Sequence, residues 1–219
     1  MTVSQHCWTD NGYRSAGDSA TGTPWEAIAR YGVRPAPGGL AMVHDFLNTQ
    51  GSQEKGSDLL GDATRATQWT RTVIRARARP NNRHYPLQPL TNHDAERLRQ
   101  LRDDLLTSLT GMPAEIRTVG AATFTLAATG EICWAPSGAG WRWVYGAILG
   151  EVLLSQHTGS WRRLKHCQNG ACLAIFYDSS WNNSAVWHNA GTCGTTNTNR
   201  QSNSGDISVR QAGQALRPR

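Results

Sequence analysis

The sequence predicts an α+β protein: a mainly helical N-terminal domain with a small β-hairpin, followed by a small zinc-bound C-terminal module. Apolar residues recur at helical spacing in two long segments, 91–109 and 141–157. Two short strand-like runs, 123–126 and 131–134, flank a turn that contains Gly130. Three of the five cysteines fall in the last third of the chain beside a histidine, which favours a metal site there.

The composition is compatible with one medium-sized domain and a small module. The chain has 219 residues, and its nine tryptophans supply large buried surfaces to a sequence that is only 38% hydrophobic. No apolar run approaches the ~20 residues of a membrane span, and the N-terminus lacks the pattern of a secretory signal. The odd number of cysteines does not form a disulfide framework. We therefore expect a cytoplasmic protein with no membrane partner.

Four regions follow from the composition along the chain. Residues 1–36 are rich in Ser, Gly, Thr and Pro and are predicted to be a partly disordered leader. The helical domain is expected over residues 37–160, and the metal-binding module over residues 161–199. Residues 200–219 form a polar and basic tail.

Four helices are expected in the helical domain. The first spans 40–49, and a short one is capped near Asp62. The third begins after Thr91 or Asn92 and carries a leucine stripe at 98, 101, 105 and 109. The fourth spans 141–157 and places residues 144, 148, 152 and 153 on one face. Trp141 and Trp143 at its start either pack in the core or line an aromatic ligand pocket.

Asp45 and Asn48 form a polar pair on the first predicted helix. Their spacing of three places both side chains on one side, next to the apolar face. Such a pair is either a satisfied buried network or part of a ligand pocket.

The metal motif consists of two matched pairs of residues. Cys167 and Cys172 are spaced C-x4-C, and His188 and Cys193 are spaced H-x4-C. Three thiolates and one imidazole form a closed tetrahedral site for structural zinc, which supplies folding energy to a small module. Four protein ligands leave no open position, so a catalytic zinc is disfavoured. His166 is a competing ligand, but it directly precedes Cys167 and should point elsewhere.

The pattern around these ligands resembles the CGNR zinc finger. The positions that carry the resemblance are Cys172, Phe176, Asp178, Ser180, Asn182, Ser184, Trp187, Cys193 and Gly194. In that family the finger follows a mainly helical ABATE domain in bacterial proteins assigned to transcriptional regulation. The run from Asp45 to Thr49 is similar to the family's Asp-Phe-x-Asn-Thr signature. The resemblance covers residues 38–198 and implies a regulator-like fold.

Several departures from the family pattern affect the expected function. His188 stands where the family usually has cysteine. The family also places arginines among the Ser and Asn residues and before the tryptophan, and here those positions hold Trp181, Ala185 and Val186. Residues 167–199 contain no Lys or Arg, although the chain carries a net charge of +6. DNA affinity depends largely on basic side chains that neutralise phosphates. The finger therefore favours metal binding and disfavours DNA reading.

We expect a regulator-derived zinc protein that binds, sequesters or transforms a small, aromatic metabolite, as in secondary metabolism. The predicted ligand-binding residues are Asp45, Asn48, Trp181 and Trp187. Whether the protein is an enzyme is left open. The candidate acid/base residues are His44, Asp45 and Asp178.

Two alternatives remain. The first is a ligand-responsive transcriptional regulator that contacts DNA through Arg162, Arg163, Lys165, Arg200 and the arginines of 210–219. The second is a homodimeric scaffold held together by exposed aromatic side chains.

Overall fold

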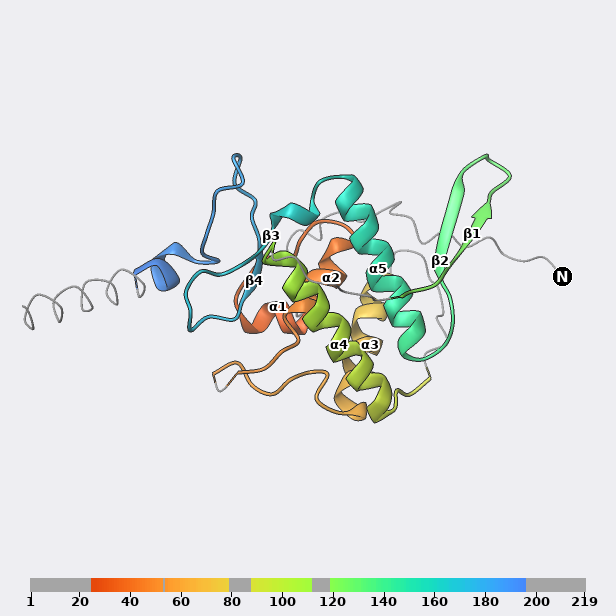
Figure 1. Cartoon of the computed structure of the whole chain (residues 1–219), viewed down its shortest axis with the longest axis horizontal. Helices are drawn as coiled ribbons and strands as arrows, with labels where there is room; N and C mark the ends of the chain where they lie inside the picture. Colours follow the sequence, from red (N-terminus) through yellow and green to blue (C-terminus); the bar gives the residue numbers. More distant parts are fainter. Residues whose placement is uncertain (1–24, 53, 79–87, 112–118, 196–219) are drawn as a thin grey trace, which may run out of the picture.

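The computed structural model describes residues 25–52, 54–78, 88–111 and 119–195. Figure 1 shows a helical body with a β-hairpin projecting at one end and the cysteine-rich module at the other. The predictions for residues 1–24 and 200–219, Arg200 included, lie outside the described residues. Within the described ranges, no helix is long and apolar enough to cross a membrane.

The body is built around α2, the helix that spans Leu40–Leu47. All eight of its residues are buried, so it forms the centre of the hydrophobic core. It contacts α1, α4 and α5 as well as strand β4 of the C-terminal module. The helices around it are α1 (Glu26–Arg30), α3 (Ala63–Ala78), α4 (Asn92–Leu109) and α5 (Trp141–His157).

The predicted helices are found with small differences at their ends. Helix α4 begins after Thr91 with a capping box: the Asp94 N–H donates to Thr91 Oγ1 at 3.1 Å, and the Thr91 N–H donates to the Asp94 carboxylate at 2.7 Å. Helix α5 has the predicted bounds. Helix α3 is longer than the predicted short helix because Val73 and Ile74 continue its buried face beyond Trp69.

Residues 25–36 are the part of the predicted, partly disordered leader that the structure describes, and they pack against the body. Helix α1 lies in this segment, and Trp25 and Ile28 are buried in the core. The backbone N–H of Ile28 donates to Asp45 Oδ1 at 2.9 Å, which fixes α1 against α2. A helix of five residues is too short to show a hydrophobic period, so its burial had no signal in the sequence.

The predicted hairpin consists of β1 (Ala122–Leu126) and β2 (Ile132–Pro136), which pair antiparallel with Phe124 opposite Trp134. It packs against α5. A second antiparallel pair, β3 (Leu164–His166) and β4 (Ile175–Tyr177), forms the base of the C-terminal module. The 3-10 turn η2 (Trp161–Arg163) connects α5 to β3.

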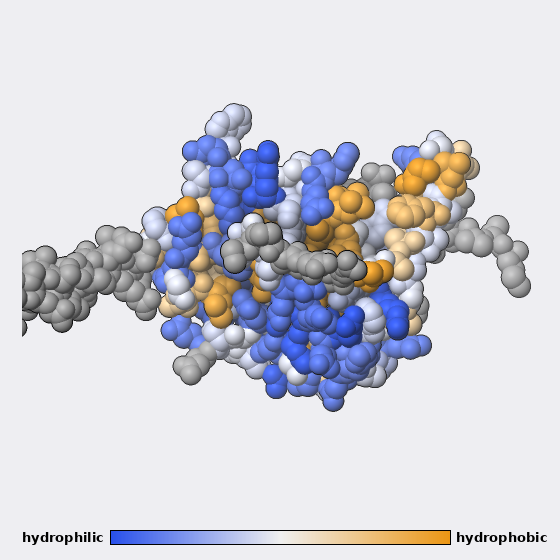
Figure 2. Space-filling model, in the orientation of Figure 1, coloured by the Kyte–Doolittle hydropathy of each residue, from blue (hydrophilic) through white to orange (hydrophobic). Residues whose placement is uncertain are grey.

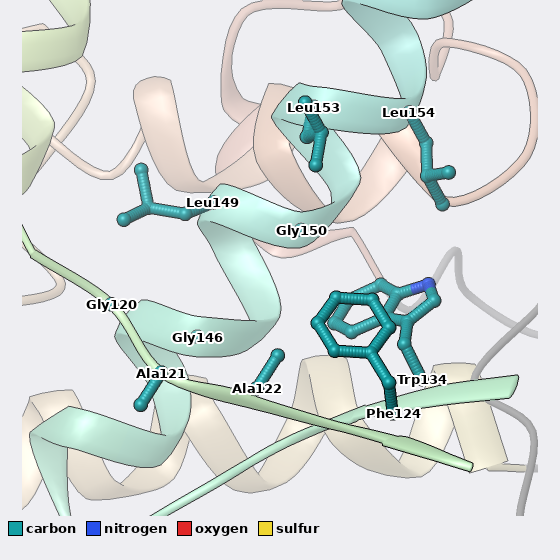
Figure 3. A pocket seen from close by; sticks show the side chains of 10 residues that line it. All are labelled: Gly120, Ala121, Ala122, Phe124, Trp134, Gly146, Leu149, Gly150, Leu153 and Leu154. Atoms are coloured by element: carbon teal, nitrogen blue, oxygen red, sulfur yellow. The ribbon is translucent and has the colours of Figure 1, made fainter.

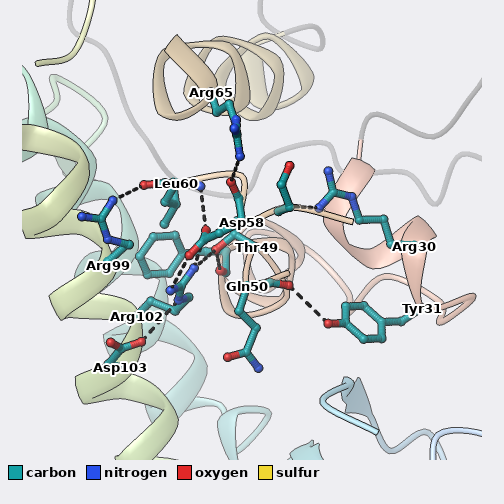
Figure 4. A network of polar contacts seen from close by, with 12 residues as sticks. Arg30, Tyr31, Thr49, Gln50, Asp58, Leu60, Arg65, Arg99, Arg102 and Asp103 are labelled. Carbon is teal, nitrogen blue, oxygen red and sulfur yellow. Dashed lines mark hydrogen bonds and ion pairs between the residues drawn. The ribbon is translucent and has the colours of Figure 1, made fainter. Parts of the chain in front are cut away.

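An ion pair between a buried arginine and a half-buried aspartate fixes the loop that follows α2 (Figure 4). Arg102 on α4 donates two hydrogen bonds to the Asp58 carboxylate, at 2.8 and 2.9 Å, and a third to Thr49 Oγ1 at 3.1 Å. Bidentate pairing of this kind is geometrically specific. It holds the chain directly after the Asp45–Thr49 run against α4.

Candidate metal centre and apolar cavity

The loop between β3 and β4 positions the first two cysteines. The Cys167 N–H donates to the Ala174 carbonyl at 2.9 Å, and the Cys172 N–H donates to the Asn169 carbonyl at 2.8 Å. The buried Asn169 side chain accepts the Ala171 N–H at 3.1 Å. These bonds form a tight knuckle that turns both thiols to the same side.

The second pair of predicted ligands lies around η3, a short π-helical turn that spans Ala190–Gly194. The Cys193 N–H donates to the Asn189 carbonyl at 2.9 Å. The ring of Trp187 lies over Gly194, where a Cβ atom would come within 3.3 Å of a ring carbon. A hydrogen bond of 2.9 Å from the Gln168 N–H to the Val186 carbonyl joins this part to the knuckle.

The structure brings together the four residues predicted to bind metal. The ligand atoms of Cys167, Cys172, His188 and Cys193 all lie within 4.8 Å of one another. His188 Nδ1 is 3.5 Å from Cys172 Sγ and 3.6 Å from Cys193 Sγ. A tetrahedral zinc ion with Zn–S bonds of ~2.3 Å and Zn–N bonds of ~2.05 Å places these atoms about 3.6 Å apart. The donor set and its spacing therefore fit zinc, with Nδ1 as the imidazole ligand.

The cluster is closed on one side and open on the other. Cys167 and Cys193 are each 6% exposed, and Cys172, His188 and Cys193, but not Cys167, line a cleft of about 570 Å³. His166 does not compete, because its Nε2 lies 3.3 Å from the Leu106 carbonyl of α4. Cys133 of β2 is buried and disulfide-bonded, so it takes no part in the cluster. Disulfides are typical of oxidising compartments and rare in the cytosol. The disulfide at Cys133 therefore does not support the expected cytoplasmic setting, which stays a prediction.

The electrostatics of the cluster also favour a cation. Burial raises the pKa of the Cys172 thiol to about 12, and the neighbouring Cys167 and Cys193 oppose a further negative charge. Burial lowers the pKa of His188, which keeps the imidazole in its neutral, metal-binding form. Three crowded thiols become thiolates only when a positive ion compensates their charges.

Asp178 anchors the loop that connects the two ligand pairs. Its buried carboxylate accepts the Lys165 ammonium at 2.7 Å, the Ser180 N–H at 2.8 Å and the Ala185 N–H at 2.8 Å. Burial alone would raise the pKa of Asp178, but these donors outweigh it and hold the pKa well below its usual range. Asp178 is therefore a charged structural anchor, and its catalytic assignment is not supported.

Two of the cations predicted to contact DNA in the regulator alternative, Arg163 and Lys165, donate hydrogen bonds to the same loop. Lys165 Nζ also donates to the Asn183 carbonyl at 2.7 Å. Arg163 Nη1 donates to the carbonyls of Asp178 and Ser180 at 2.9 and 2.8 Å. Among the three cations of residues 162–165, only Arg162 is exposed.

The Asp-Phe-x-Asn-Thr signature joins α2 to β4. The Asn48 amide donates to the Ile175 carbonyl at 3.0 Å and accepts the Ile175 N–H at 3.0 Å. His44 Nε2 lies 2.9 Å from the same carbonyl, and its Nδ1 accepts the Ala36 N–H at 3.2 Å. The helical body thus contacts the zinc module through two side chains that satisfy the backbone of β4.

The predicted acid/base grouping does not form. Burial lowers the pKa of His44 to about 4, so its ring is neutral. Burial raises the pKa of Asp45 to about 6, and its carboxylate accepts the Trp69 Nε1–H at 2.8 Å besides the Ile28 N–H. His44, Asp45 and Asn48 have no exposed surface. Of the two interpretations of the polar pair, the structure matches the buried network.

The two tryptophans predicted to bind ligand also lie elsewhere. Trp181 is 98% exposed, and Trp187 packs beside Cys193 in the small cluster around the metal ligands. Neither lines a pocket with Asp45 or Asn48, because those side chains are enclosed between α2, its neighbours and β4. Trp141 packs edge-on against Tyr145 with Arg97 and Arg142 over its ring, which favours its packing role.

The sequence interpretation missed an apolar cavity between the hairpin and α5 (Figure 3). Its volume is about 320 Å³. Leu153 was expected on the buried face of α5, but it is 63% exposed and lies at this cavity. The signal available in the sequence was the excess of apolar residues in β1 and β2. The lining residues are Gly120, Ala121, Ala122, Phe124, Trp134, Gly146, Leu149, Gly150, Leu153 and Leu154.

Comparison with known proteins agrees with the geometry of the metal cluster. No curated protein matches the chain. Residues 163–203 match the family model described as the CGNR zinc finger, and this segment contains all four clustered residues. The ABATE assignment of the helical body stays a prediction. The C-terminal segment is thus similar to the CGNR zinc finger, and the match and the Cys3His cluster together indicate a zinc-binding site.

Proposed function

We propose that the protein is a zinc-stabilised binding protein for a small, apolar, aromatic molecule, and that the cavity between the hairpin and α5 is its site. The observation that carries this proposal is the apolar lining of that cavity, with Phe124 and Trp134 as aromatic walls. Ligand sites are mostly apolar concavities of roughly 300–1,000 Å³. An apolar cavity of roughly 150 Å³ holds benzene, so about 320 Å³ accommodates a fused bicyclic ring.

Two glycines of α5 allow the hairpin to approach the helix closely. A Cβ atom on Gly150 would lie within 2.0 Å of the Trp134 ring, and one on Gly146 would lie within 2.4 Å of the Ala121 carbonyl. The indole of Trp134 therefore rests on the backbone of α5 and forms one wall of the cavity. None of the lining residues is charged, which favours a neutral ligand.

The zinc module supports this function by holding the body together. Its β4 strand is bonded to the central helix α2 through His44 and Asn48. The described residues offer no exposed acid/base pair at the cavity, so the proposal is binding or sequestration and includes no reaction.

Binding is tested with indole and naphthalene as probes on the zinc-loaded full chain, by calorimetry and by thermal shift. Ala122 points into the cavity from β1, so Ala122→Phe fills it (Figure 3). Thr129→Phe adds the same ring at the exposed hairpin turn and serves as the matched control. We expect Ala122→Phe to weaken probe binding at least about tenfold, since it replaces the probe in its apolar site, and Thr129→Phe to leave it unchanged. Equal probe affinity in wild type and Ala122→Phe contradicts the proposal.

The second candidate is the ligand-responsive transcriptional regulator. It is favoured by the net charge of +6 and by the exposed side chain of Arg162. It is opposed by the internal bonds of Arg163 and Lys165, which leave the finger with few cations to offer to phosphates. We therefore rank it below small-molecule binding.

A further inference from the structure

Helix α3 carries a row of polar side chains along its exposed side. The row consists of Thr64, Gln68, Arg71 and Arg75, which are all exposed. Their spacings of four, three and four residues place them on one side of an α-helix. Trp69 and Val73, on the other side of α3, are buried in the core. At a rise of 1.5 Å per residue, the row is about 16 Å long.

A groove of about 620 Å³ runs along this row, between α3 and the segment that leads into α4. All four residues of the row line it, and Pro89 and Leu90 line it from that segment. The Leu90 N–H donates to Thr67 Oγ1 at 2.8 Å, and the Ala63 N–H donates to Asn92 Oδ1 at 2.9 Å. These two bonds fix the segment against α3, so the groove has a defined shape.

The two arginines of the groove are not neutralised. The side chains of Arg71 and Arg75 make no ion pair or hydrogen bond with the residues that the structure describes. Arg65 of the same helix, by contrast, pairs with Asp62 at 3.0 Å. No carboxylate lines the groove, and residues 63–93 contain neither Asp nor Glu. The positive charge of the groove is therefore available to an anion.

The arrangement of these side chains suits a phosphate group that is attached to a polyol. Arg71 and Arg75 lie one helical turn apart, about 6 Å along the axis, so their long side chains can reach the same anion. A guanidinium binds phosphate oxygens through paired N–H donors. Gln68 and Thr64 continue the row with uncharged donors and acceptors, which form hydrogen bonds with hydroxyl groups.

Other anionic partners match the groove less well. None of its described lining residues is aromatic, so it lacks the stacking surface that binds nucleotide bases and single-stranded nucleic acids. A helix that binds a membrane surface combines basic residues with an exposed hydrophobic face. On the face shown in Figure 2, the end of the body where Figure 1 places α3 and α4 is mainly hydrophilic, and hydrophobic side chains gather near the hairpin. The volume of the groove is in the range of small-molecule sites.

We propose that the groove on α3 binds a small phosphorylated polyol, such as a sugar phosphate. The phosphate lies between Arg71 and Arg75, and the hydroxyl groups bond to Gln68 and Thr64. No residue lines both this groove and the apolar cavity of the proposed function. The two sites can therefore be occupied at the same time, and neither proposal depends on the other.

The test is a titration of the zinc-loaded full chain with ribose 5-phosphate, followed by calorimetry and phosphorus NMR. Wild type should bind this probe and should not bind ribose, which lacks the anion. Arg71→Gln and Arg75→Gln should each weaken binding about tenfold, because each removes a charge-assisted pair of hydrogen bonds. Arg162→Gln is the matched control: it removes an exposed arginine outside the groove and should bind the probe like wild type.

The hydroxyl end of the site is tested with inorganic phosphate. This ion should bind about fivefold more weakly than ribose 5-phosphate, the value of one lost hydrogen bond, and Gln68→Ala should reduce that difference. Circular dichroism and the melting temperature should be the same in all four variants, because the substituted side chains are exposed.

Three results would each overturn the inference. They are the absence of ribose 5-phosphate binding by wild type, binding that Arg71→Gln and Arg75→Gln leave unchanged, and equal affinity for inorganic phosphate. Salt-dependent binding of a DNA duplex that Arg71→Gln abolishes would identify the groove as a nucleic-acid surface and would also contradict it.

Discussion

Replacing Asn48 by alanine tests whether the Asp-Phe-x-Asn-Thr run stabilises the fold by joining α2 to β4, or whether it binds a ligand. Asn48 has no exposed surface, and its amide makes three hydrogen bonds, two with the backbone of Ile175 and one with the His44 carbonyl, each of 3.0 Å. Alanine removes all three. The Ile175 carbonyl keeps its contact with His44 Nε2, but the Ile175 N–H loses its acceptor inside the protein.

The expected cost follows from these bonds. Each hydrogen bond contributes about 1 kcal/mol, and a buried donor left without an acceptor costs about 1–3 kcal/mol. Two ordinary bonds and one unpaired buried donor should therefore lower the free energy of unfolding by about 3–5 kcal/mol, a large part of the roughly 5–15 kcal/mol of a typical domain. Asn92→Ala is the matched control, because exposed Asn92 accepts only the Ala63 N–H among the bonds seen, at 2.9 Å, and its loss should cost about 1 kcal/mol or less.

The measurement is urea unfolding of the zinc-loaded protein, followed by tryptophan fluorescence and circular dichroism. Asn48→Asp separates shape from hydrogen bonding: it preserves the outline, yet it places a carboxylate against the Ile175 and His44 carbonyls and should destabilise at least as much. Because β4 begins three residues after Cys172, we also expect faster zinc loss to a chelator. If Asn48→Ala has the same free energy of unfolding as Asn92→Ala and loses only ligand affinity, Asn48 does not stabilise the fold by joining α2 to β4.

Three further predictions concern the metal, DNA and pH. His188→Ala and Cys172→Ser should each lower the zinc content, measured by mass spectrometry of the native protein, from one ion towards none, whereas the exposed control Asn182→Ala should retain it. Genomic DNA fragments at ~150 mM salt should show no shift with micromolar protein, and a salt-dependent shift would instead support the regulator. Burial lowers the pKa of His44 to about 4 in the folded protein, whereas in the unfolded chain it has the ordinary histidine value of about 6.5. As the pH falls below about 6.5, the unfolded chain therefore binds a proton at His44 that the folded protein does not, and the free energy of unfolding decreases. His44→Gln should show a smaller decrease between pH 7 and 5 in urea unfolding than wild type.

Elements with a strong local signal could be predicted from the sequence. The leucine stripe and the Thr91 cap specify α4, and the alternation around Gly130 specifies the hairpin. Helix α1 and the extension of α3 were missed because their burial depends on contacts with distant segments.

The spacing of Cys167, Cys172, His188 and Cys193 was enough to predict the metal cluster, because zinc demands a fixed set and number of N and S ligands that the sequence displays directly. The absence of Lys and Arg from residues 167–199 is also evident from the sequence alone. Only the tertiary structure decided what the other polar and aromatic residues do. Asn48 and Asp45 belong to a buried hydrogen-bond network, and Trp181 is exposed to solvent. The sequence could not show this, because burial and hydrogen-bond partners arise from segments far apart in the chain. The apolar cavity likewise exists only where the hairpin rests on α5 at Gly146 and Gly150, a contact that no local pattern specifies.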